Sequence, residues 1–424
     1  MNISEIKNKI SNGELDCEFD LLYSETEKAA VRYTAALESF CELYGERENL
    51  RIFSAPGRTE VSGNHTDHQH GSILAGSVDL DVIAIVSANN DGKIRIKSEG
   101  YNMDEVNICD LEKNDKEKGR AISLIKGVCS KFKEMGCEIR GFDAYTTSNV
   151  LKGSGLSSSA AFEVLIGNIV NGLFFENGAD AVTIAKIGQY AENVYFGKPS
   201  GLLDQMASSL GGFTYADFND PKEPITESID LDINSFGYTL CVVDTGGNHA
   251  NLTGDYADIT EECKQISNAL GVDFLRDADI DKFYGSIADL RNKFGDRAVL
   301  RAFHFFNEQE RVLAGRNALK SRDFETFLKL VNESGVSSYD YLQNLYSVSN
   351  VKNQGLSLGI ALTKNFLKEH GACRVHGGGF AGTIQCYIPT DLFASYKEMI
   401  EKVFGNGSCC KIFVRKVGGY EIKL

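Results

Sequence analysis

Residues 153–161 read GSGLSSSAA and stand at the start of a stretch, AAFEVLIGNIVNGLF at 160–174, whose apolar residues recur at helical spacing. The N-terminus of a helix exposes unpaired N–H groups and a partial positive charge, so it suits an anion. Glycines let the backbone approach that anion closely, and serine hydroxyls cap helices or bind magnesium. The patterns G-x-x-x-x-G-K-[ST] and G-x-G-x-x-G do not occur here. The stretch indicates either a phosphate-binding loop of another kind or a flexible loop with an ordinary serine N-cap.

A second stretch, PGRTEVSGNHTDHQHG at 56–71, crowds ionisable and amide side chains together. One interpretation is a zinc site, for which His65, Asp67, His68 and His70 would supply ligands. On a strand or turn these side chains point in different directions, and no second group of His and Cys residues completes a zinc shell. A plainer interpretation makes one or two of them, His70 in particular, surface turn residues.

Recognition of a sugar is the third interpretation of this stretch. A polyol needs short donors and acceptors around its ring, and Asp67 can accept from two adjacent hydroxyls. Asn64 and His65 can donate or accept, and the cation Arg58 can hold a phosphoryl group or acidify a hydroxyl.

Two further stretches add weaker signals. Residues 191–212, AENVYFGKPSGLLDQMASSLGG, place Glu192 on an expected helix and Asp204 after a glycine turn. Two such acids can have different roles: one binds magnesium, and the other orients or deprotonates an attacking hydroxyl. Acids at helix ends are also common caps. Residues 376–383, HGGGFAGT, read as a tight turn between a helix and a strand.

The composition excludes several classes of protein. The 44 basic and 59 acidic residues give a net charge of −15, which argues against a nucleic-acid partner. No apolar run approaches the roughly 18 residues of a membrane helix, and the first residues do not resemble a secretory signal. None of the eleven cysteines forms a C-x-x-C pair, which is typical of reduced thiols in the cytoplasm.

The order of expected elements predicts two α+β domains. Expected strands are RIFSAPG running into a turn, two strands about the Asn-Asp-Gly turn at 90–92, IRGFDAYTTSNV, YTLCVVDT, GTIQCYI and KIFVRKV. Helices are expected at 25–45 and after residue 120, and over most of 254–370. A polar, proline-bearing segment near 215–235 suggests domains of 1–220 and 221–424.

Taken together, these stretches resemble galactokinases of the GHMP small-molecule kinase superfamily. APGRTEVSGNHTDHQHG resembles the galactokinase signature, GSGLSSSAA the phosphate loop of the family and HGGGFAGT its third motif, in the family's order. Weaker similarity extends through SFCELYG, AISLIKGV, NHANLTGDYADITEEC and LRAFHFFNEQERV. The resemblance implies a two-domain GHMP kinase fold with the active site in the cleft between the domains. It also implies transfer of phosphate from ATP to the anomeric hydroxyl of a sugar, most simply galactose.

The resemblance also implies roles for particular residues. Asp204 matches the family's catalytic aspartate and Arg58 its catalytic arginine, while Ser159 and Glu192 match positions that hold Mg²⁺. The positions expected to contact the sugar are Asn64, His65, Asp67 and Tyr256. The positions expected to bind ATP are Gly153, Ser154, Gly155, Leu156, Ser157, Ser158 and Ser159.

The chain departs from the family pattern on the expected sugar side. Asn64 stands where the family usually has a glutamate associated with the sugar's 6-hydroxyl, and His68 replaces a tyrosine. A glutamate would repel a C6 carboxylate, whereas an amide can donate to it, so a uronic acid such as galacturonate is an alternative substrate. The runs GGNH and YSVSNVKNQGLS also differ from the family.

A galactose sensor without turnover is an alternative of another class, since some relatives of these kinases are regulators. The presence of Arg58, Asp204 and the serines of the loop favours an enzyme. We therefore expect a cytoplasmic kinase, a monomer or weak oligomer, whose partners are a sugar, ATP and Mg²⁺, without nucleic acid or membrane.

Overall fold

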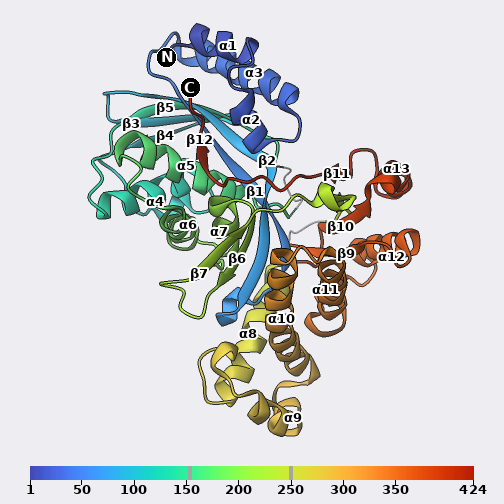
Figure 1. Cartoon of the computed structure of the whole chain (residues 1–424). Coiled ribbons are helices and arrows are strands. Elements are labelled where there is room, and N and C mark those ends of the chain that lie inside the picture. The colour runs from blue at the N-terminus through green and yellow to red at the C-terminus, as the bar shows by residue number, and fades with distance from the viewer. Residues whose placement is uncertain (151–154, 248–251) are drawn as a thin grey trace.

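A computed structural model describes residues 1–150, 155–247 and 252–424. The helices in these ranges are α1 (Ile3–Ser11), α2 (Asp16–Leu22), α3 (Thr26–Tyr44), α4 (Ala121–Glu134), α5 (Ser158–Phe174), α6 (Ala181–Tyr190), α7 (Leu203–Leu210), α8 (Thr253–Ala269), α9 (Ile280–Phe294), α10 (Asp296–Lys320), α11 (Phe324–Ser337), α12 (Gly355–Leu367) and α13 (Phe393–Phe404). The strands are β1 (Arg51–Ser62), β2 (Ser72–Ala88), β3 (Lys93–Ser98), β4 (Met103–Asn107), β5 (Phe142–Ser148), β6 (Phe213–Asp217), β7 (Ile225–Ile229), β8 (Tyr238–Asp244), β9 (Ala372–His376), β10 (Thr383–Pro389), β11 (Cys409–Lys411) and β12 (Tyr420–Glu421). Two sheets, each with its own helices, organise the molecule (Figure 1).

The first sheet is built around the long strands β1 and β2. Its strands follow the order β12-β1-β2-β5-β3-β4, and β6 pairs with the first part of β2 and carries β7 on its other side. Alternate residues of β2 enter different cores, because side chains alternate across a strand. Ile83 and Ile85 pack with α1–α3, whereas Val82 and Ala84 pack with α4–α6 on the other face. The sheet is therefore covered by helices on both faces at this point.

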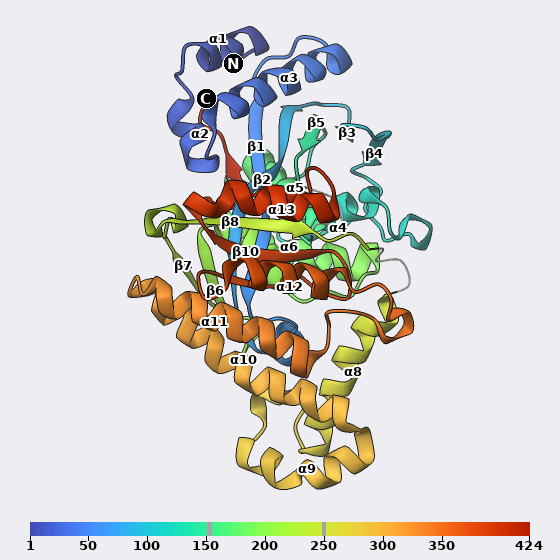
Figure 2. The same cartoon turned by 90° about the vertical axis from the view of Figure 1, so that its right-hand side faces the viewer.

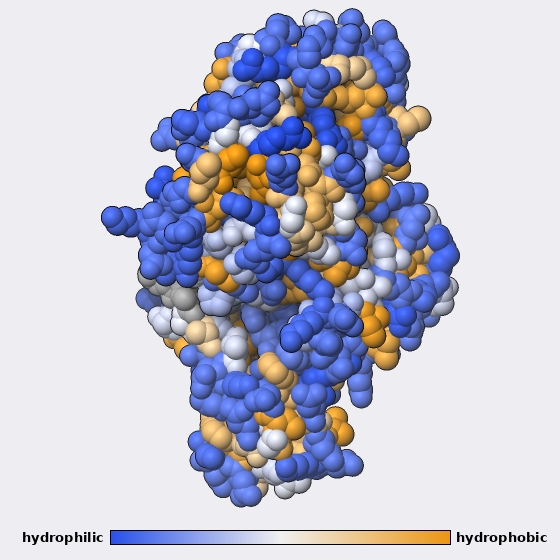
Figure 3. Space-filling view, turned by 90° about the vertical axis from the view of Figure 1, so that its left-hand side faces the viewer, coloured by the Kyte–Doolittle hydropathy of each residue, from blue (hydrophilic) through white to orange (hydrophobic). Residues whose placement is uncertain are grey.

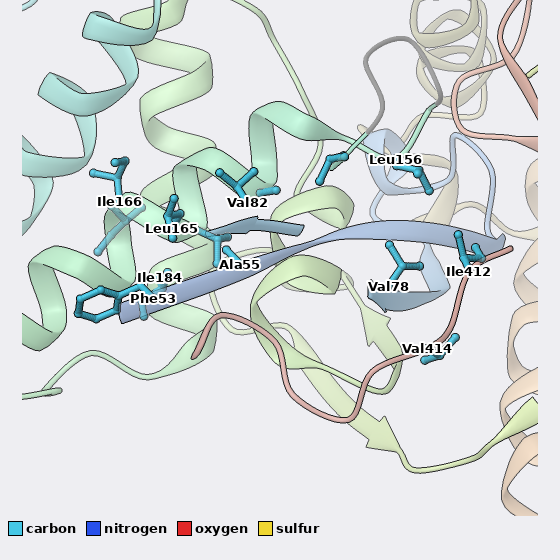
Figure 4. Packing of buried hydrophobic residues seen from close by; sticks show 14 of the residues in the cluster. Phe53, Ala55, Val78, Val82, Leu156, Leu165, Ile166, Ile184, Ile412 and Val414 are labelled. Atoms are coloured by element: carbon cyan, nitrogen blue, oxygen red, sulfur yellow. The ribbon is translucent and has the colours of Figure 1, made fainter. Parts of the chain in front are cut away.

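Helix α5, which follows the phosphate loop, packs directly on β1. Leu165 and Ile166 of this helix lie beside Phe53 and Ala55 of the strand, and all four are at most 1% exposed (Figure 4). Full burial of each larger side chain contributes about 1.5–3 kcal/mol. The packing fixes the beginning of α5 relative to the strand that carries Arg58.

The second sheet has the order β11-β8-β10-β9 and is covered by α12 and α13. Its core includes Cys241, Cys373, Cys386 and Cys409, all nearly or completely buried. All eleven cysteines of the chain are free thiols, and seven of them are buried, as expected for small apolar side chains.

A helical arm formed by α8, α9 and part of α10 extends beyond the sheets, whereas α11 packs against β9 (Figure 2). Helix α10 is 25 residues long and packs against α8, α9, α11 and β2. Val312 of α10 and Phe327 of α11 join the large core of the first sheet. The long helix therefore connects the arm to the part of the molecule that contains the three motifs.

The structure corrects several expectations about individual elements. Strand β1 does not turn after Pro56 but continues to Ser62, with irregular pairing to β2 between Pro56 and Arg58 and again after Glu60. The two strands expected about the Asn-Asp-Gly turn are present as β2 and β3, and β5 lies between them in the sheet. The stretch KIFVRKV forms only the end of β11, and HGGGFAGT connects two strands, β9 and β10.

The division of the chain at residue 220 stays a prediction. Strand β7, at 225–229, pairs with β6 and so belongs to the first sheet, and the last strand, β12, returns to pair with β1.

The face of the molecule seen in Figure 3 is mostly hydrophilic, with apolar residues in small groups. Among the described helices, none combines the length and apolar character needed to cross a bilayer.

A buried polar cluster around Asp81 joins distant parts of the chain. The carboxylate of Asp81 is 0% exposed and receives bonds from Arg32 at 2.5 Å and Arg415 at 3.3 Å. Tyr23 and Ser54 each donate a hydroxyl to it at 2.5 Å. This carboxylate thereby connects the end of α2, α3, β1 and the C-terminal segment to β2.

We expect Asp81→Ala to lower the free energy of unfolding by about 3–5 kcal/mol, because it leaves a completely buried arginine without an acidic partner. The midpoint of urea unfolding measures this loss. As a control, Glu105→Gln breaks the exposed Lys93–Glu105 pair and should leave the midpoint unchanged. Equal midpoints for the two variants would contradict the role assigned to the cluster.

Candidate functional site

The three motifs meet where the phosphate loop joins α5. The backbone N–H of Arg58, in the first motif, donates to the carbonyl of Leu156 at 3.0 Å, and its guanidinium donates to the carbonyl of Gly155. A Cβ atom at Gly155 would lie 3.0 Å from both the ring of His376 and the hydroxyl of Thr383, in the third motif. Gly57 has no room for a side chain, because its Cβ would lie 2.8 Å from the Leu156 carbonyl. The described part of the loop, at Gly155 and Leu156, therefore lies against strands from both halves of the chain.

Asp204 lies at the centre of this junction. Arg58 contacts its Oδ1 through Nε at 2.7 Å and Nη2 at 2.6 Å, and Ser157 donates its hydroxyl to Oδ2 at 2.7 Å. The side chain of Arg58 is only 7% exposed, whereas that of Asp204 is 28% exposed. The carboxylate is thus held on both oxygens by the protein and still reaches the surface of the site.

The side chain of Ser157 is not the ordinary N-cap that the sequence allowed as an alternative. Its side chain makes no capping bond to α5, since the hydroxyl is directed at Asp204. The residue also has a φ of 55°, in the left-handed region that residues other than glycine rarely adopt. Such strain is typical of functional sites, where the surrounding structure holds it in place.

The electrostatic environment keeps Asp204 ionised. Burial by itself would raise its pKa, but Arg58 and Ser157 more than offset this effect and lower it below the ordinary value. A carboxylate with a lowered pKa is a weak base that stays ionised near pH 7 and can accept hydrogen bonds.

Glu192 forms a second acidic centre beside the same loop. It lies in a π-helical turn at 191–196, a type of turn often found at functional sites. Its Oε1 accepts from Ser159 at 3.1 Å and from Lys198 at 2.8 Å. Its Oε2 accepts from Ser200 at 2.6 Å and from Gln205 at 3.0 Å. Ser159 and Glu192, which the sequence paired only through the resemblance, are therefore direct neighbours.

Oxygen donors of this kind suit Mg²⁺, which prefers carboxylates, hydroxyls and phosphates. The side chain of Glu192 is 2% exposed, and the side chain of Lys198, whose ammonium group contacts it, is 57% exposed. The carboxylate is thus buried with a cation at its solvent side. The residues present fit a divalent cation, and Lys198 is a nearby residue that sequence reasoning missed, although it lies within the stretch 191–212.

Three of the four residues expected to contact a sugar converge on the carbonyl groups of the third motif. Asn64 donates to the carbonyl of Gly377 at 2.8 Å. The ring of His65 is bonded to the carbonyl of Gly378 at 2.9 Å, and Tyr256 donates to that of Gly379 at 2.9 Å. The glycine turn thus fixes the orientation of all three side chains.

Asn64 is deeply buried and fully engaged. It is 1% exposed, and its amide nitrogen also donates to Glu60 at 2.7 Å. Its Oδ1 accepts from Asn344 at 2.6 Å, a partner that no sequence pattern indicated because it lies 280 positions away. A direct bond from Asn64 to a substrate would require one of these contacts to be exchanged.

Asp67 occupies a different position, against the loop that leads into α7. A Cβ atom at Gly201 would lie 1.6 Å from Oδ2 of Asp67, so the Asp67 side chain packs directly on the backbone of Gly201. Gly201 precedes Asp204 by three residues, which span at most about 11 Å when extended. The two aspartates are therefore neighbours across one short loop.

The structure does not support a zinc site in the histidine-rich stretch. Within the described residues no group of three or more His, Cys, Asp or Glu side chains is placed to hold a metal. His65 faces Gly378, and His70 stacks on Phe274 with 3.5 Å between ring centres. Burial lowers the pKa of His65 to about 4, so its ring is neutral near pH 7.

Part of the expected ATP loop lies outside the described residues, namely Gly153 and Ser154. The others, Gly155 through Ser159, lead into and begin α5.

Comparison with known proteins gives consistent results. The "Galactokinase galactose-binding signature" family matches residues 38–88, and the "GHMP kinases N terminal domain" family matches residues 123–212. A galactokinase of Streptomyces coelicolor is 32% identical over 371 residues, covering 87% of this chain and 92% of that protein. A galactokinase of Ligilactobacillus salivarius is 30% identical over 389 residues, with the same coverage of both chains.

Solved structures share the fold. Lactococcus lactis galactokinase in complex with galactose aligns with a TM-score of 0.77 at 23% identity, covering 92% of this chain and 99% of that one. A mevalonate kinase aligns with a TM-score of 0.60 at 15% identity, covering 87% and 99%.

Replacing Arg58 by methionine should raise the pKa of Asp204, because it removes the charge that favours the carboxylate. In the wild type this carboxyl should titrate below the ordinary value of about 3.9. Since the folded-state pKa is the lower one, the stabilisation from this group is complete above the unfolded-state pKa. It is lost as the pH falls through the folded-state value.

Carbon-13 NMR of labelled aspartate carboxyls measures this titration. The signal of Asp204 is identified by its absence in Asp204→Asn. An identical titration in wild type and Arg58→Met would show that the guanidinium does not control this carboxylate.

Proposed function

The chain belongs to the galactokinase family of the GHMP kinases, and we propose that it transfers the γ-phosphoryl group of ATP to the anomeric hydroxyl of galactose. The products are galactose 1-phosphate and ADP. The observation that carries the proposal is the placement of Asp204, bonded to Arg58 and Ser157 where the phosphate loop joins α5.

The mechanism follows from the contacts of Asp204. Its carboxylate accepts a hydrogen bond from the anomeric hydroxyl and so aims the oxygen at the γ-phosphorus. The P–O bond to ADP breaks as the bond to the sugar oxygen forms, and the hydroxyl proton passes to the carboxylate. Because the pKa of Asp204 is lowered, proton transfer comes late, and orientation of the hydroxyl is the earlier contribution.

Arg58 has two roles in this proposal. It keeps Asp204 ionised, and its guanidinium also holds the Gly155 carbonyl. A guanidinium at this position stabilises negative charge that spreads over the transferring oxygens. Arg58 thus joins the group that receives the hydroxyl to the loop that receives the phosphates.

Residues 153–159 would wrap the triphosphate, with N–H groups at the start of α5 facing it. Ser159 and Glu192 would hold Mg²⁺, and when bound this ion neutralises charge on the phosphates. The hydrogen bond between Ser159 and Glu192 places their side-chain oxygens side by side, and Lys198 adds a positive charge beside them.

The sugar would lie between Asp67 and the side chains fixed by the third motif, His65, Asn64 and Tyr256. Asp67 suits two adjacent hydroxyls, and the neutral ring of His65 can donate or accept. Galacturonate remains the alternative substrate, because Asn64 removes a negative charge that would repel a C6 carboxylate.

We also propose that the protein is a monomer or weak oligomer. The free thiols support a reducing cytoplasmic location.

Asp204→Asn should reduce turnover by about 10³-fold or more, because it removes the group that orients and deprotonates the hydroxyl. A coupled ATP-consumption assay with galactose, galacturonate, other hexoses and pentoses measures this. Asp230→Asn, which alters an aspartate that is 71% exposed, is the control and should retain full activity.

If the wild type consumed no ATP with any of these sugars, the result would favour the hypothesis of a galactose sensor and refute that of an enzyme. A strong preference for galacturonate would replace galactose as the substrate and leave the reaction type unchanged.

Glu192→Gln should weaken the dependence of nucleotide binding on Mg²⁺ by about tenfold, because it removes a carboxylate ligand. Calorimetry with ADP, in the presence and absence of Mg²⁺, measures this coupling without turnover. A melting temperature close to that of the wild type would show that the fold is intact. If Mg²⁺ strengthened ADP binding equally in both proteins, Glu192 would not hold the ion.

A further inference from the structure

We propose that Glu308 and Gln309, adjacent residues on α10, are positioning residues that clamp the two ends of the sugar-binding turn. This turn comprises residues 63–72, from the residue after β1 to the first residue of β2, and includes His65 and Asp67. The inference rests on the proposed function, because it assigns a role in sugar binding to residues that do not touch the sugar.

The first end of the turn is held by Glu308. Its Oε1 accepts the backbone N–H of Gly63 at 2.9 Å, and the side chain is 0% exposed. Gly63 has a φ of 93° and no space for a side chain, since its Cβ would lie 2.7 Å from the carbonyl of Ser72. The backbone therefore reaches the carboxylate only because this residue is glycine.

The last residue of the turn is held by Gln309. Its Oε1 accepts the backbone N–H of Ser72 at 2.7 Å and also accepts from Arg276 at 2.9 Å. The neighbouring Gly71 approaches so closely that its Cβ would lie 2.5 Å from Nε2 of Gln309. The two ends of the turn thus bond to consecutive residues of one helix.

Contacts inside the turn reinforce this arrangement. The hydroxyl of Thr66 lies 2.9 Å from the carbonyls of both Gly63 and Ser72, which brings the ends together. His304, one helical turn before Glu308, is bonded through Nε2 to the carbonyl of Asn64 at 2.9 Å. Residues at i and i+4 lie on one face of a helix, so α10 presents a continuous polar face to the turn.

The charge of Glu308 is maintained by its surroundings. Arg311 contacts its Oε2 at 2.8 Å, and Ser334 of α11 donates to its Oε1 at 2.5 Å. Burial alone would raise the pKa of Glu308, but neighbouring His304 and Arg311 more than offset it and hold it at about 2. The carboxylate is therefore a charge-assisted acceptor for the Gly63 N–H, which is stronger than a neutral one.

The residues proposed to bind the sugar are therefore positioned by different helices from the residues proposed to act on the nucleotide. The position of His65 and Asp67 depends on α10, whereas Asp204 and Ser157 are positioned by α7 and α5. Loosening the turn should weaken sugar binding and leave nucleotide binding unchanged, because a small misplacement of positioning groups has a large effect on binding and rate.

The test uses the full chain with Gln309→Leu, which removes the acceptor for Ser72, and Glu308→Leu, which removes the acceptor for Gly63. Gln309→Glu is the conservative variant, because a carboxylate can still accept from both Ser72 and Arg276. Glu310→Leu is the matched control, since Glu310 is exposed and adjacent on the same helix.

We expect Gln309→Leu to raise the KM for galactose about tenfold, comparable to the loss of a buried hydrogen bond, while the KM for ATP changes less than about twofold. Gln309→Glu should restore the KM for galactose, and Glu310→Leu should not change it. Equal changes in both KM values, or no change in either, would overturn the inference.

Hydrogen exchange provides a readout that does not depend on activity. The amides of Gly63 and Ser72 should exchange slowly in the wild type, and each should lose protection in the variant that removes its acceptor. Unchanged protection in Gln309→Leu would refute the clamp even if Glu308→Leu failed to fold. If the wild type does not phosphorylate galactose, the proposed function fails. The exchange data alone then test whether Glu308 and Gln309 hold the two ends of the turn.

Discussion

The ion pair between Arg58 and Asp204 is the interaction on which the site depends. Arg58 comes from a strand that continues past Pro56 into the site, and Asp204 comes from the first turn of α7. The same guanidinium holds the carbonyl of Gly155, so one side chain joins the first motif, the serine-rich loop and the carboxylate that we propose to be catalytic. Their relative positions are fixed because Arg58 is almost completely buried and cannot adopt another orientation.

The sugar side of the site is assembled differently, largely through hydrogen bonds to backbone groups. The carbonyls of Gly377, Gly378 and Gly379 orient Asn64, His65 and Tyr256, while N–H groups of the turn at 63–72 are held by α10. Glycine is required where these backbones approach one another closely. The two sides of the site therefore belong to separate parts of the fold and meet at the loop between Gly201 and Asp204.

Much of the fold was predictable, because its helices and buried strands have clear periodicity. Helix α3 ends at Gly45, where a glycine stops the helical pattern, and α5 begins at the serine loop. The expectations that failed concern where strands end, and the pairing order of the strands was not predicted. The strand β5 lies between β2 and β3 although it is distant in sequence, and β1 continues through Pro56 because irregular pairing accommodates the proline. Local sequence carries no record of such long-range partners.

The sequence by itself determined the chemistry that is available: a serine-rich loop before a helix, a cluster of polar side chains between two strands, and two acids on either side of a glycine turn. It also determined the family, because motif order and residue type survive in the chain. Only the tertiary structure decided that the hydroxyl of Ser157 bonds Asp204 rather than capping its helix, and that Asn64 is buried against Asn344. The reason is physical: a side chain's hydrogen-bond partner depends on groups brought close by packing, and these groups lie tens to hundreds of residues away.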